Sequence, residues 1–233
     1  MTTVSVPELQ RAWQALQAGH FAEPPTGPAP EWLPDRPVIP VSGVHGQCGA
    51  STVALALTTL LAPARLVECA SGPTCGLTAA SAKELGPCSQ GWTRGLRGDV
   101  MIDRSYEIRL DANEVPMPAD LDRAVDRTVV DVGWDPTHVL ATRSWLSTLL
   151  LESGPAVLVA EMSVPGLRRL ENTLSLLPDT TAIAAVVGPP VKRWPKQVMG
   201  SAGTLTRQLI DEDRLVSIPV VSSLRQAGLT PEP

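Results

Sequence analysis

The segment from Ser42 to Thr52, SGVHGQCGAST, has the residue types of a loop that holds a phosphate group. An apolar run, PVIPV, precedes it, and a run typical of a helix, VALALTTLL, follows it. Glycines let backbone N–H groups converge on an anion, and the N-terminus of the following helix adds the positive end of its dipole. The order strand, glycine-rich turn, Ser-Thr and helix therefore predicts a phosphate-binding loop.

This loop lacks the lysine on which phosphate-binding loops normally depend. In the pattern GxxxxGK[ST] the second glycine is followed by lysine, whereas Gly49 is followed by Ala50. A charge-assisted bond to phosphate is worth roughly 1.5–3 kcal/mol, so its loss weakens binding about ten- to a hundredfold. The loss in catalysis is expected to be larger, because charge builds up in the transition state. Either the loop binds phosphate without efficient hydrolysis, or a cation replaces the lysine; the candidates are Arg65, Arg94, Arg97, Lys192, Arg193 and Lys196.

Acidic residues stand at or near the ends of two apolar runs that follow the loop. Glu68 follows RLV, and Asp131 follows TVV. The carboxyl ends of parallel strands meet at one edge of a sheet, which is where sites form in open α/β folds. We therefore expect Asp131 and the hydroxyl of Ser51 to hold Mg²⁺ beside the phosphate-binding loop. A turn-capping role for Asp131 within DVGWDP is the alternative.

Composition indicates a globular chain of 233 residues, with 43% hydrophobic residues and a net charge of −5. The charge argues against bulk electrostatic binding to nucleic acid and leaves a local basic patch open. No segment has the length of a membrane span and no secretory signal is visible, so we expect a cytoplasmic protein. The cysteines form no CxxC pair, which favours reduced thiols over a zinc site; they are Cys48, Cys69, Cys75 and Cys88.

The first 36 residues differ in character from the rest. Leu9, Trp13 and Leu16 have the spacing of one face of a short helix over 6–21. The proline-rich stretch that follows favours an extended tether. The helix could dock on a partner, or its tryptophan and Trp32 could pack on the domain, and the sequence leaves both open.

From residue 37 onward, apolar runs alternate with helical stretches. The runs are continuous, as expected for strands buried on both faces. We predict an α/β fold over 37–233, with a doubly wound, mostly parallel sheet and helices on both faces. Residues 70–126 carry the weakest signal, with a hairpin expected through 106–110. The expected strands are 37–42, 65–69, 128–132, 156–160, 181–187 and 215–219, and the expected helices lie near 51–62, 138–152, 164–177 and 200–212.

These motifs together resemble the ParA/MinD family, the deviant Walker A branch of the P-loop ATPases. The family motif KGGxGK[ST][ST] aligns without a gap on HGQCGAST, residues 45–52. RLVECASG resembles the segment after the second strand, with Glu68 in the place of an aspartate, and RTVVDVGWD resembles the Walker B-like strand. RLVSIPVVSSLRQAGLTP resembles the family's C-terminal segment, whose proline lies near the adenine. The resemblance covers 38–230, with a divergent middle at 70–126.

The resemblance implies ATP or ADP with Mg²⁺ as ligand and a homodimer formed over the nucleotide. It also implies that Ser51 and Asp131 are the metal ligands. His45 stands at the place of the family's signature lysine, and Gln47 adds a side chain where the family has glycine. The implied cofactor-binding residues are His45, Gly46, Gln47, Cys48, Gly49, Ala50, Ser51, Thr52, Glu68, Asp131 and Pro219.

Because both family lysines are absent, the favoured hypothesis is a non-hydrolysing or weakly nucleotide-binding scaffold or positioning adaptor. Its partner would be a protein of DNA partition, conjugative transfer or secretion-system placement. The alternative is an active, lysine-independent ATPase of plasmid partition or transfer that dimerises over ATP and binds DNA. Lys192, Arg193 and Lys196, with Trp194 stacking on bases, could form its nucleic-acid patch; the alternative is a solvated loop with a packed tryptophan. A carboxylate-activating synthetase on this fold, or a thiol enzyme built on Cys48, lacks any further catalytic group that the sequence places.

Overall fold

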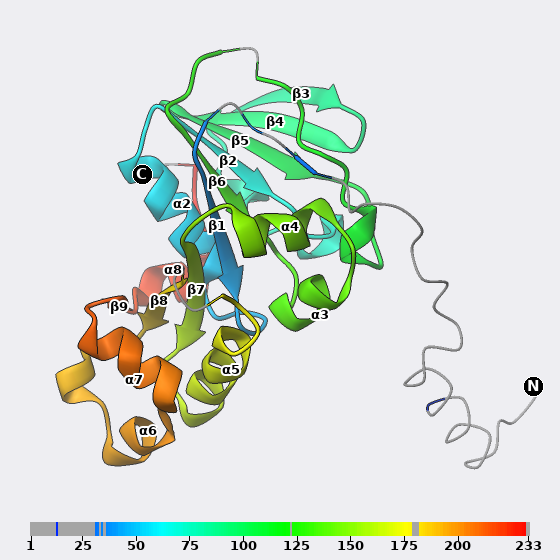
Figure 1. Cartoon of the computed structure of the whole chain (residues 1–233). Coiled ribbons are helices and arrows are strands. Elements are labelled where there is room, and N and C mark those ends of the chain that lie inside the picture. The colour runs from blue at the N-terminus through cyan, green and yellow to red at the C-terminus, as the bar shows by residue number, and fades with distance from the viewer. Residues whose placement is uncertain are drawn as a thin grey trace, which may run out of the picture.

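The structure, a computed structural model, describes Trp13, Glu31, Trp32, Pro34 and residues 36–121, 123–178 and 182–231. Within these residues nine strands form one sheet in the order β3-β4-β5-β2-β6-β1-β7-β8-β9. Figure 1 shows this sheet running through the molecule with helices packed against it. The strands are β1 Val38–Gly43, β2 Ala64–Glu68, β3 Lys83–Ser89, β4 Trp92–Arg97, β5 Val100–Ser105, β6 Arg127–Asp131, β7 Ala156–Glu161, β8 Ala182–Val187 and β9 Leu215–Ile218.

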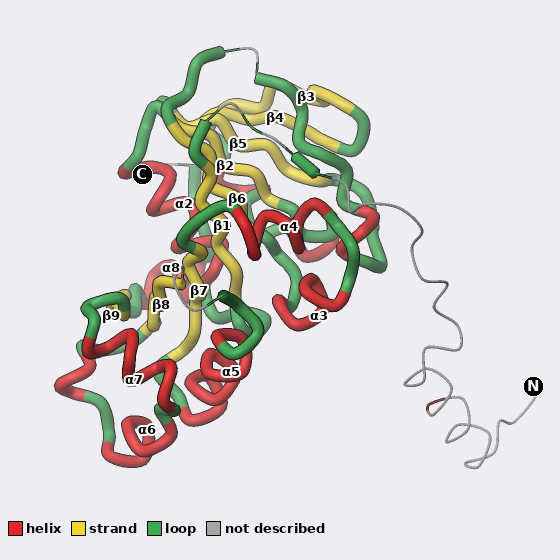
Figure 2. The backbone as a smooth tube through the Cα atoms, viewed as in Figure 1, coloured by secondary structure: helices red, strands yellow, loops and turns green. Residues whose placement is uncertain are grey.

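Every pairing from β5 across to β9 is parallel, whereas β4 pairs antiparallel with both β3 and β5. The predicted α/β class with a mostly parallel sheet is confirmed. All six strands expected from the apolar runs form, with ends shifted by at most one residue; residue 181, in the fifth, lies outside the described residues. Figure 2 shows the helices that connect them. These are α2 Ala50–Leu60, α3 Pro136–Ala141, α4 Trp145–Glu152, α5 Val164–Leu174, α6 Lys196–Ser201, α7 Thr204–Asp211 and α8 Ser222–Ala227.

Two of the expected helices are each divided in two. The stretch 138–152 contains α3 and α4, because the Ser144 hydroxyl accepts the Ser147 N–H and starts a new helix with a capping box. The stretch 200–212 contains the end of α6 and all of α7, separated at Gly203, which has extended backbone at φ −78° and ψ −172°. Local capping residues therefore end one helix and begin another within stretches that the hydrophobic periodicity predicts as single helices.

The middle segment contains strands where the sequence predicts little structure. The hairpin expected at 106–110 is wrong, because these residues follow β5 as irregular chain. The antiparallel strands β3, β4 and β5 form instead, and Gly91 and Gly98 take positive φ (80° and 56°) at the two turns. Asp103 of β5 is fully buried, and it accepts hydrogen bonds from Arg65 and Arg94. Charge pairing therefore buries side chains that a hydropathy pattern places at the surface.

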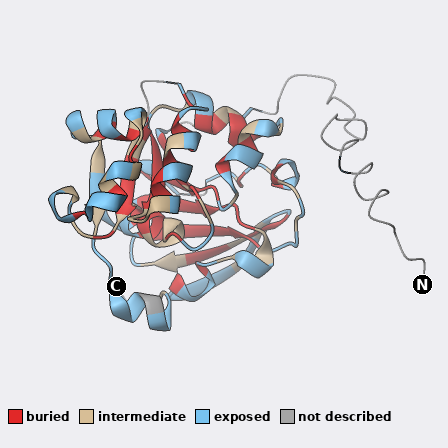
Figure 3. Cartoon of the chain, turned by 90° about the horizontal axis from the view of Figure 1, so that it is seen from below, coloured by how far each residue is buried: buried red, intermediate tan, exposed pale blue. Residues whose placement is uncertain are grey.

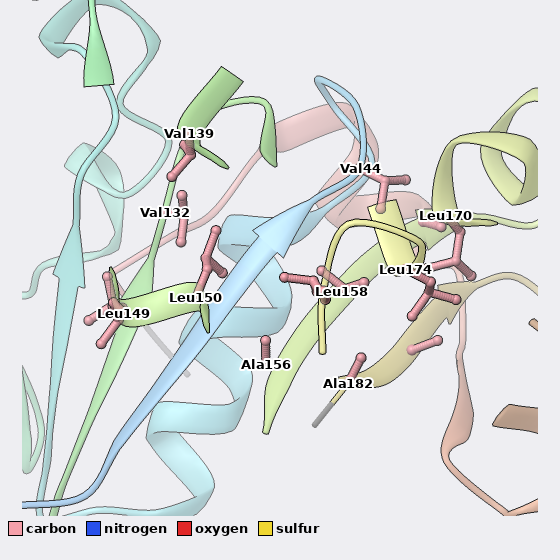
Figure 4. Close-up of a cluster of buried hydrophobic side chains, with 14 of the residues drawn as sticks. Val44, Val132, Val139, Leu149, Leu150, Ala156, Leu158, Leu170, Leu174 and Ala182 are labelled. Atoms are coloured by element: carbon pink, nitrogen blue, oxygen red, sulfur yellow. The ribbon is translucent and has the colours of Figure 1, made fainter. Parts of the chain in front are cut away.

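The sheet is covered on both faces, and Figure 3 shows its strands buried between exposed helix surfaces. Val157 and Val159 of β7 belong to the core cluster that includes α2. Ala156 and Leu158 belong to the larger cluster that includes α3 to α7. Figure 4 shows this second cluster, where Leu158 lies among side chains of the covering helices. The alternation explains why the strand sequences are continuously apolar.

Most of the predicted N-terminal helix and tether lies outside the described residues. Trp32 packs edge-on against Trp145 of α4, with ring centroids 5.4 Å apart, so the end of the tether contacts the domain. Trp13 is described as helical and is 62% exposed. The division at residue 36 stays a prediction. None of the helices in the described ranges is long and apolar enough to cross a bilayer.

Candidate functional site

The segment between β1 and α2 forms a sharp turn around the carboxyl end of the central strand β1. Gln47 and Gly49 take left-handed backbone conformations, with φ of 62° and 94°. Gly43 is required by packing, because a Cβ there would lie 2.7 Å from the Cys48 Sγ. Gly49 then caps α2 at its N-terminus. The backbone therefore has the strand, turn and helix geometry that the loop sequence predicts.

The N-terminus of α2 presents unpaired backbone donors. Its first intrahelical bond runs from the Val53 N–H to the Gly49 carbonyl, at 3.0 Å. The N–H groups of Ser51 and Thr52 precede that bond, and no hydrogen bond to an acceptor within the described residues uses them. An eleven-residue helix adds the positive end of its dipole at the same place. These groups can bind an anion.

Two loop residues differ from what a phosphate-binding loop requires. Gln47 adopts a left-handed conformation that costs a non-glycine residue about 1 kcal/mol or more, and its side chain is exposed. His45 lies against its own loop, with Nδ1 2.9 Å from the Gly46 carbonyl oxygen. Their roles toward a ligand, and those of Gly46, Cys48 and Thr52, stay predictions.

Asp131, at the end of β6, carries a carboxylate that is fully buried. Neither of its oxygens has a hydrogen-bond partner among the described residues. Burial, and next the negative charge of Glu68, raise its pKa to about 7; the Ser51 hydroxyl and the Gly133 N–H are close enough to oppose this rise, although neither makes a hydrogen bond of normal geometry to the carboxylate. Buried polar atoms are rarely left unpaired in proteins without a functional reason. A cation placed between Asp131 and Ser51 would satisfy them.

The donor set is therefore suited to Mg²⁺, which takes hard oxygen ligands and usually completes its shell with water and phosphate oxygens. The hydroxyl of Ser51 and the carboxylate of Asp131 are the residues that would hold it. Among the described residues, no group of three or more His, Cys, Asp and Glu side chains could hold a metal ion without such help. Mg²⁺ is thus expected here only together with a phosphate ligand.

Glu68 ends β2, in register with Asp131 on the neighbouring strand β6. Its carboxylate is fully buried and accepts hydrogen bonds from the Gly76 N–H at 2.6 Å, the Leu77 N–H at 3.1 Å and the thiol of Cys75. Burial raises its pKa in spite of these donors and of the positive charge of Arg104. Protein donors thus engage both oxygens, and a direct contact of Glu68 with a cofactor stays a prediction.

The turns that follow β2 and β6 are packed against each other. A Cβ at Gly133 would lie 2.6 Å from the Ala70 nitrogen, and Gly133 has a φ of 69°. The Trp134 indole N–H donates to the Cys69 carbonyl at 2.8 Å. The turn after β2 and the turn after β6, which follow Glu68 and Asp131, are therefore fixed to each other by these contacts.

Pro219 follows the carboxyl end of β9, on the same edge of the sheet as the loop. It is exposed and follows β9, where the Gly188 N–H donates to the Ile218 carbonyl at 2.8 Å. One residue earlier, Val187 has its Cγ2 3.6 Å from the position a Cβ would take on Gly49. The end of β8 thus lies between the loop and Pro219, whose place near an adenine stays a prediction.

The arginines proposed as substitutes for the missing lysine are engaged elsewhere. Arg65 and Arg94 form ion pairs with Asp103, at 2.5 Å and 2.7 Å. Arg97 donates to the carbonyls of Ala80 and Thr230. Other polar groups of the chain thus hold all three of these cations.

The basic cluster after β8 is exposed, but its tryptophan is not. Lys192, Arg193 and Lys196 are exposed, in the short helix Val191–Arg193 and at the start of α6. Trp194 is buried, and its indole N–H donates to the Pro189 carbonyl at 2.9 Å. The prediction that Trp194 stacks on bases is therefore wrong, because its ring belongs to the core.

The structure also argues against a thiol enzyme built on Cys48. This side chain is 2% exposed, under the loop and against Gly43. Burial raises the pKa of its thiol, so the reactive thiolate is disfavoured. Cys48 acts here as a small apolar side chain.

Two contributors to the site are absent from the sequence interpretation. The segment 75–77, which Glu68 binds, lies in the middle region that carried no motif. Arg104 of β5 is in register with Glu68 and donates to the Thr78 carbonyl at 3.1 Å. An arginine at the end of a buried strand indicates that it has a polar partner, but only the strand register shows which residue that partner is.

No protein-family model matches the chain, and no curated protein matches its sequence. Solved structures similar to it include a plasmid partition protein from Borrelia burgdorferi B31 bound to AMPPNP, at 14% identity and a TM-score of 0.48, covering 82% of this chain and 90% of that one. A ParA family ATPase from Chlorobium tepidum TLS is 14% identical with a TM-score of 0.48, covering 83% and 87%. A nucleotide-binding protein from Archaeoglobus fulgidus in complex with ADP is 12% identical with a TM-score of 0.44, covering 82% and 84%.

Proposed function

We propose that this chain is a degenerate ParA/MinD-like protein that binds a nucleotide weakly, together with Mg²⁺, and does not hydrolyse it efficiently. It would serve as a scaffold or positioning adaptor in DNA partition, conjugative transfer or secretion-system placement. The observation that supports this most strongly is the fully buried Asp131 carboxylate, whose oxygens have no partner in the described residues and lie on the Ser51 side of the sheet.

In this proposal the backbone supplies the binding of the phosphates. The N–H groups of Ser51 and Thr52 and the dipole of α2 attract an anion without any side-chain charge. The Ser51 hydroxyl and the Asp131 carboxylate hold Mg²⁺, whose chemistry is to neutralise phosphate oxygens. The same parts suffice for weak binding of ATP or ADP.

Efficient hydrolysis needs positive charge where negative charge develops, and the loop does not supply it. Ala50 occupies the lysine position, and the structure places Arg65 and Arg94 in a buried network with Asp103. Glu68 is bound to its own loop and so is not placed to orient a water molecule. Each of these features favours binding over turnover.

The proposed role requires partners. A protein of a partition, transfer or secretion machine is the expected partner, and a second copy of the chain could face the site. The exposed cations Lys192, Arg193 and Lys196 support contact with nucleic acid by charge alone. If so, that contact should weaken steeply with salt and show little dependence on base sequence.

Titration with a fluorescent ATP analogue, with and without Mg²⁺, tests the proposed function. The wild-type chain should bind the analogue, and Mg²⁺ should tighten binding. Asp131→Ala should abolish the Mg²⁺ effect, because it removes the carboxylate ligand. Asp126→Ala is the matched control, because Asp126 is exposed just before β6 and should leave the titration unchanged.

Turnover measured on the same samples distinguishes the two functional hypotheses. Little release of phosphate from ATP supports the scaffold. Turnover that Asp131→Ala removes would instead identify the lysine-independent ATPase, and a wild-type chain that binds no analogue would contradict both.

A further inference from the structure

The loop from Cys75 to Leu77, here called the cap loop, lies directly against Ser51. A Cβ placed on Gly76 would be 3.4 Å from the Ser51 Oγ and 3.7 Å from the Glu68 Oε1. Gly76 is exposed and Ser51 is partly exposed, so the backbone of Gly76 lies at the open side of the Ser51 hydroxyl. The space that a cation bound to Ser51 would need thus borders the cap loop.

Glu68 is the group that holds the near side of this loop. Its Oε1 accepts the N–H groups of Gly76 at 2.6 Å and Leu77 at 3.1 Å, and its Oε2 accepts the Cys75 thiol. All the donors it has within the described residues belong to the cap loop. Hydrogen bonds to a charged carboxylate are about twice as strong as neutral ones, so this one side chain fixes the loop position.

The far side of the loop is held independently. Leu77 is fully buried in the core cluster of α2, and Arg104 donates to the carbonyls of Leu77 at 3.4 Å and Thr78 at 3.1 Å. Cys75 is half-buried and Gly76 exposed, so neither has comparable packing. Cys75 keeps its own bond from its N–H to the Gly72 carbonyl at 3.3 Å, so loss of the bonds to Glu68 would loosen Gly76 most, while Leu77 stays in place.

We propose that Glu68 is a latch that keeps the cap loop closed over Ser51, so that a nucleotide with its cation enters only when these hydrogen bonds open. This inference depends on the proposed function, since it concerns entry to the same site. A closed loop reduces the fraction of binding-competent molecules, and the apparent affinity falls by that fraction. Weak binding would then have two causes, the missing lysine and the latch.

Glu68→Gln tests the latch, because it keeps the size of the side chain and removes the charge. We expect the amide hydrogen of Gly76 to exchange with solvent roughly tenfold faster, as the loss of about 1.5 kcal/mol would give. The association rate of a fluorescent ATP analogue with Mg²⁺ should rise by a similar factor. Cys75→Ala, which removes one donor and leaves the carboxylate, should give a smaller change in the same direction and guards against misfolding of Glu68→Gln.

The matched control is Glu171→Gln. Glu171 also accepts two backbone N–H groups and a hydroxyl, from Leu205 and Thr206 of α7, but α5 and α7 pack in the larger core cluster, whereas α2 packs in the other. Its substitution should speed exchange at Leu205 and Thr206 and leave nucleotide entry unchanged. The control separates opening of the cap loop from any general loosening.

The outcomes separate this inference from the proposed function. Faster exchange at Gly76 together with faster entry supports the latch. Unchanged exchange in both variants, or faster exchange with unchanged entry into a chain that does bind the analogue, overturns the latch alone. A wild-type chain that binds no nucleotide overturns the proposed function, and the latch with it.

Discussion

Asp131 and Ala50 show at the scale of single residues how this site differs from a hydrolytic one. Asp131 keeps a buried carboxylate without a protein partner, which is costly unless a ligand uses it. Ala50, at the first position of α2, removes the charge that would attract the same ligand. Under the proposed function, the ligands for a cation are kept while the phosphate-binding side chain is missing.

Restoring that charge with Ala50→Lys should tighten binding of a fluorescent ATP analogue roughly ten- to a hundredfold, because a charge-assisted bond to phosphate returns. It should not restore full turnover, because His45 still occupies the place of the second family lysine. A titration and a phosphate-release assay check the two parts. Ala56→Lys, an exposed position on the same helix, is the control for charge. Turnover at the level of an intact family member would contradict the prediction.

At the scale of elements, helices α5 and α7 are joined by a carboxylate. Glu171 of α5 accepts the N–H groups of Leu205 and Thr206 and the Thr206 hydroxyl, each within 2.9 Å. Partial desolvation raises its pKa, but these hydrogen bonds outweigh that effect, and its pKa lies below the ordinary value of 4.5. The folded state therefore favours the charged form.

The sign of the pH dependence follows from this lowered pKa. The stabilisation is fully present above pH 4.5, the ordinary value, and is lost as the pH falls through the lower folded value. Glu171→Gln should therefore lower the free energy of unfolding near pH 6, by less than about 1 kcal/mol since the group is partly exposed. The difference should vanish at low pH. Urea denaturation of both proteins between pH 3 and pH 6, values spanning the ordinary carboxyl pKa, is the measurement. A difference that stays constant over this range would refute the assignment.

The sequence was sufficient for the elements whose signal is local. The continuous apolar runs predict the buried parallel strands, and glycine spacing predicts the loop at 42–52. The strands β3 to β5 could not be predicted in this way, because Arg94 and Asp103 are buried as an ion pair that only the register creates. The contact between Glu68 and Gly76 could not be predicted either, because it depends on how an irregular segment folds back over α2.

At the scale of the whole molecule, the sheet separates two cores. Leu66 and Val129, two residues before Glu68 and Asp131 on their strands, belong to the core of α2. Since strand side chains alternate, both carboxylates lie on that face of the sheet. The opposite face packs under α3 to α7 and forms the larger buried core cluster.

The relation of the N-terminal segment to the domain can be tested on its two tryptophans. Trp32→Ala should lower the stability of the whole domain by about 1–2 kcal/mol, since the ring packs edge-on against Trp145. Trp13→Ala should leave it unchanged, because that side chain is 62% exposed. Denaturant unfolding of both variants measures the two changes in the free energy of unfolding. Equal losses would show that the predicted helix also packs on the domain.

The indole of Trp134 has a practical consequence. It is bonded to the residue that follows Glu68 and lies close to Asp131 in sequence, so it joins the two strand exits. A ligand that shifts either exit changes the polarity around this ring. Its emission spectrum should then provide an intrinsic optical signal of occupancy, readable without any label; replacing Trp134 by phenylalanine would silence that signal and identify its source.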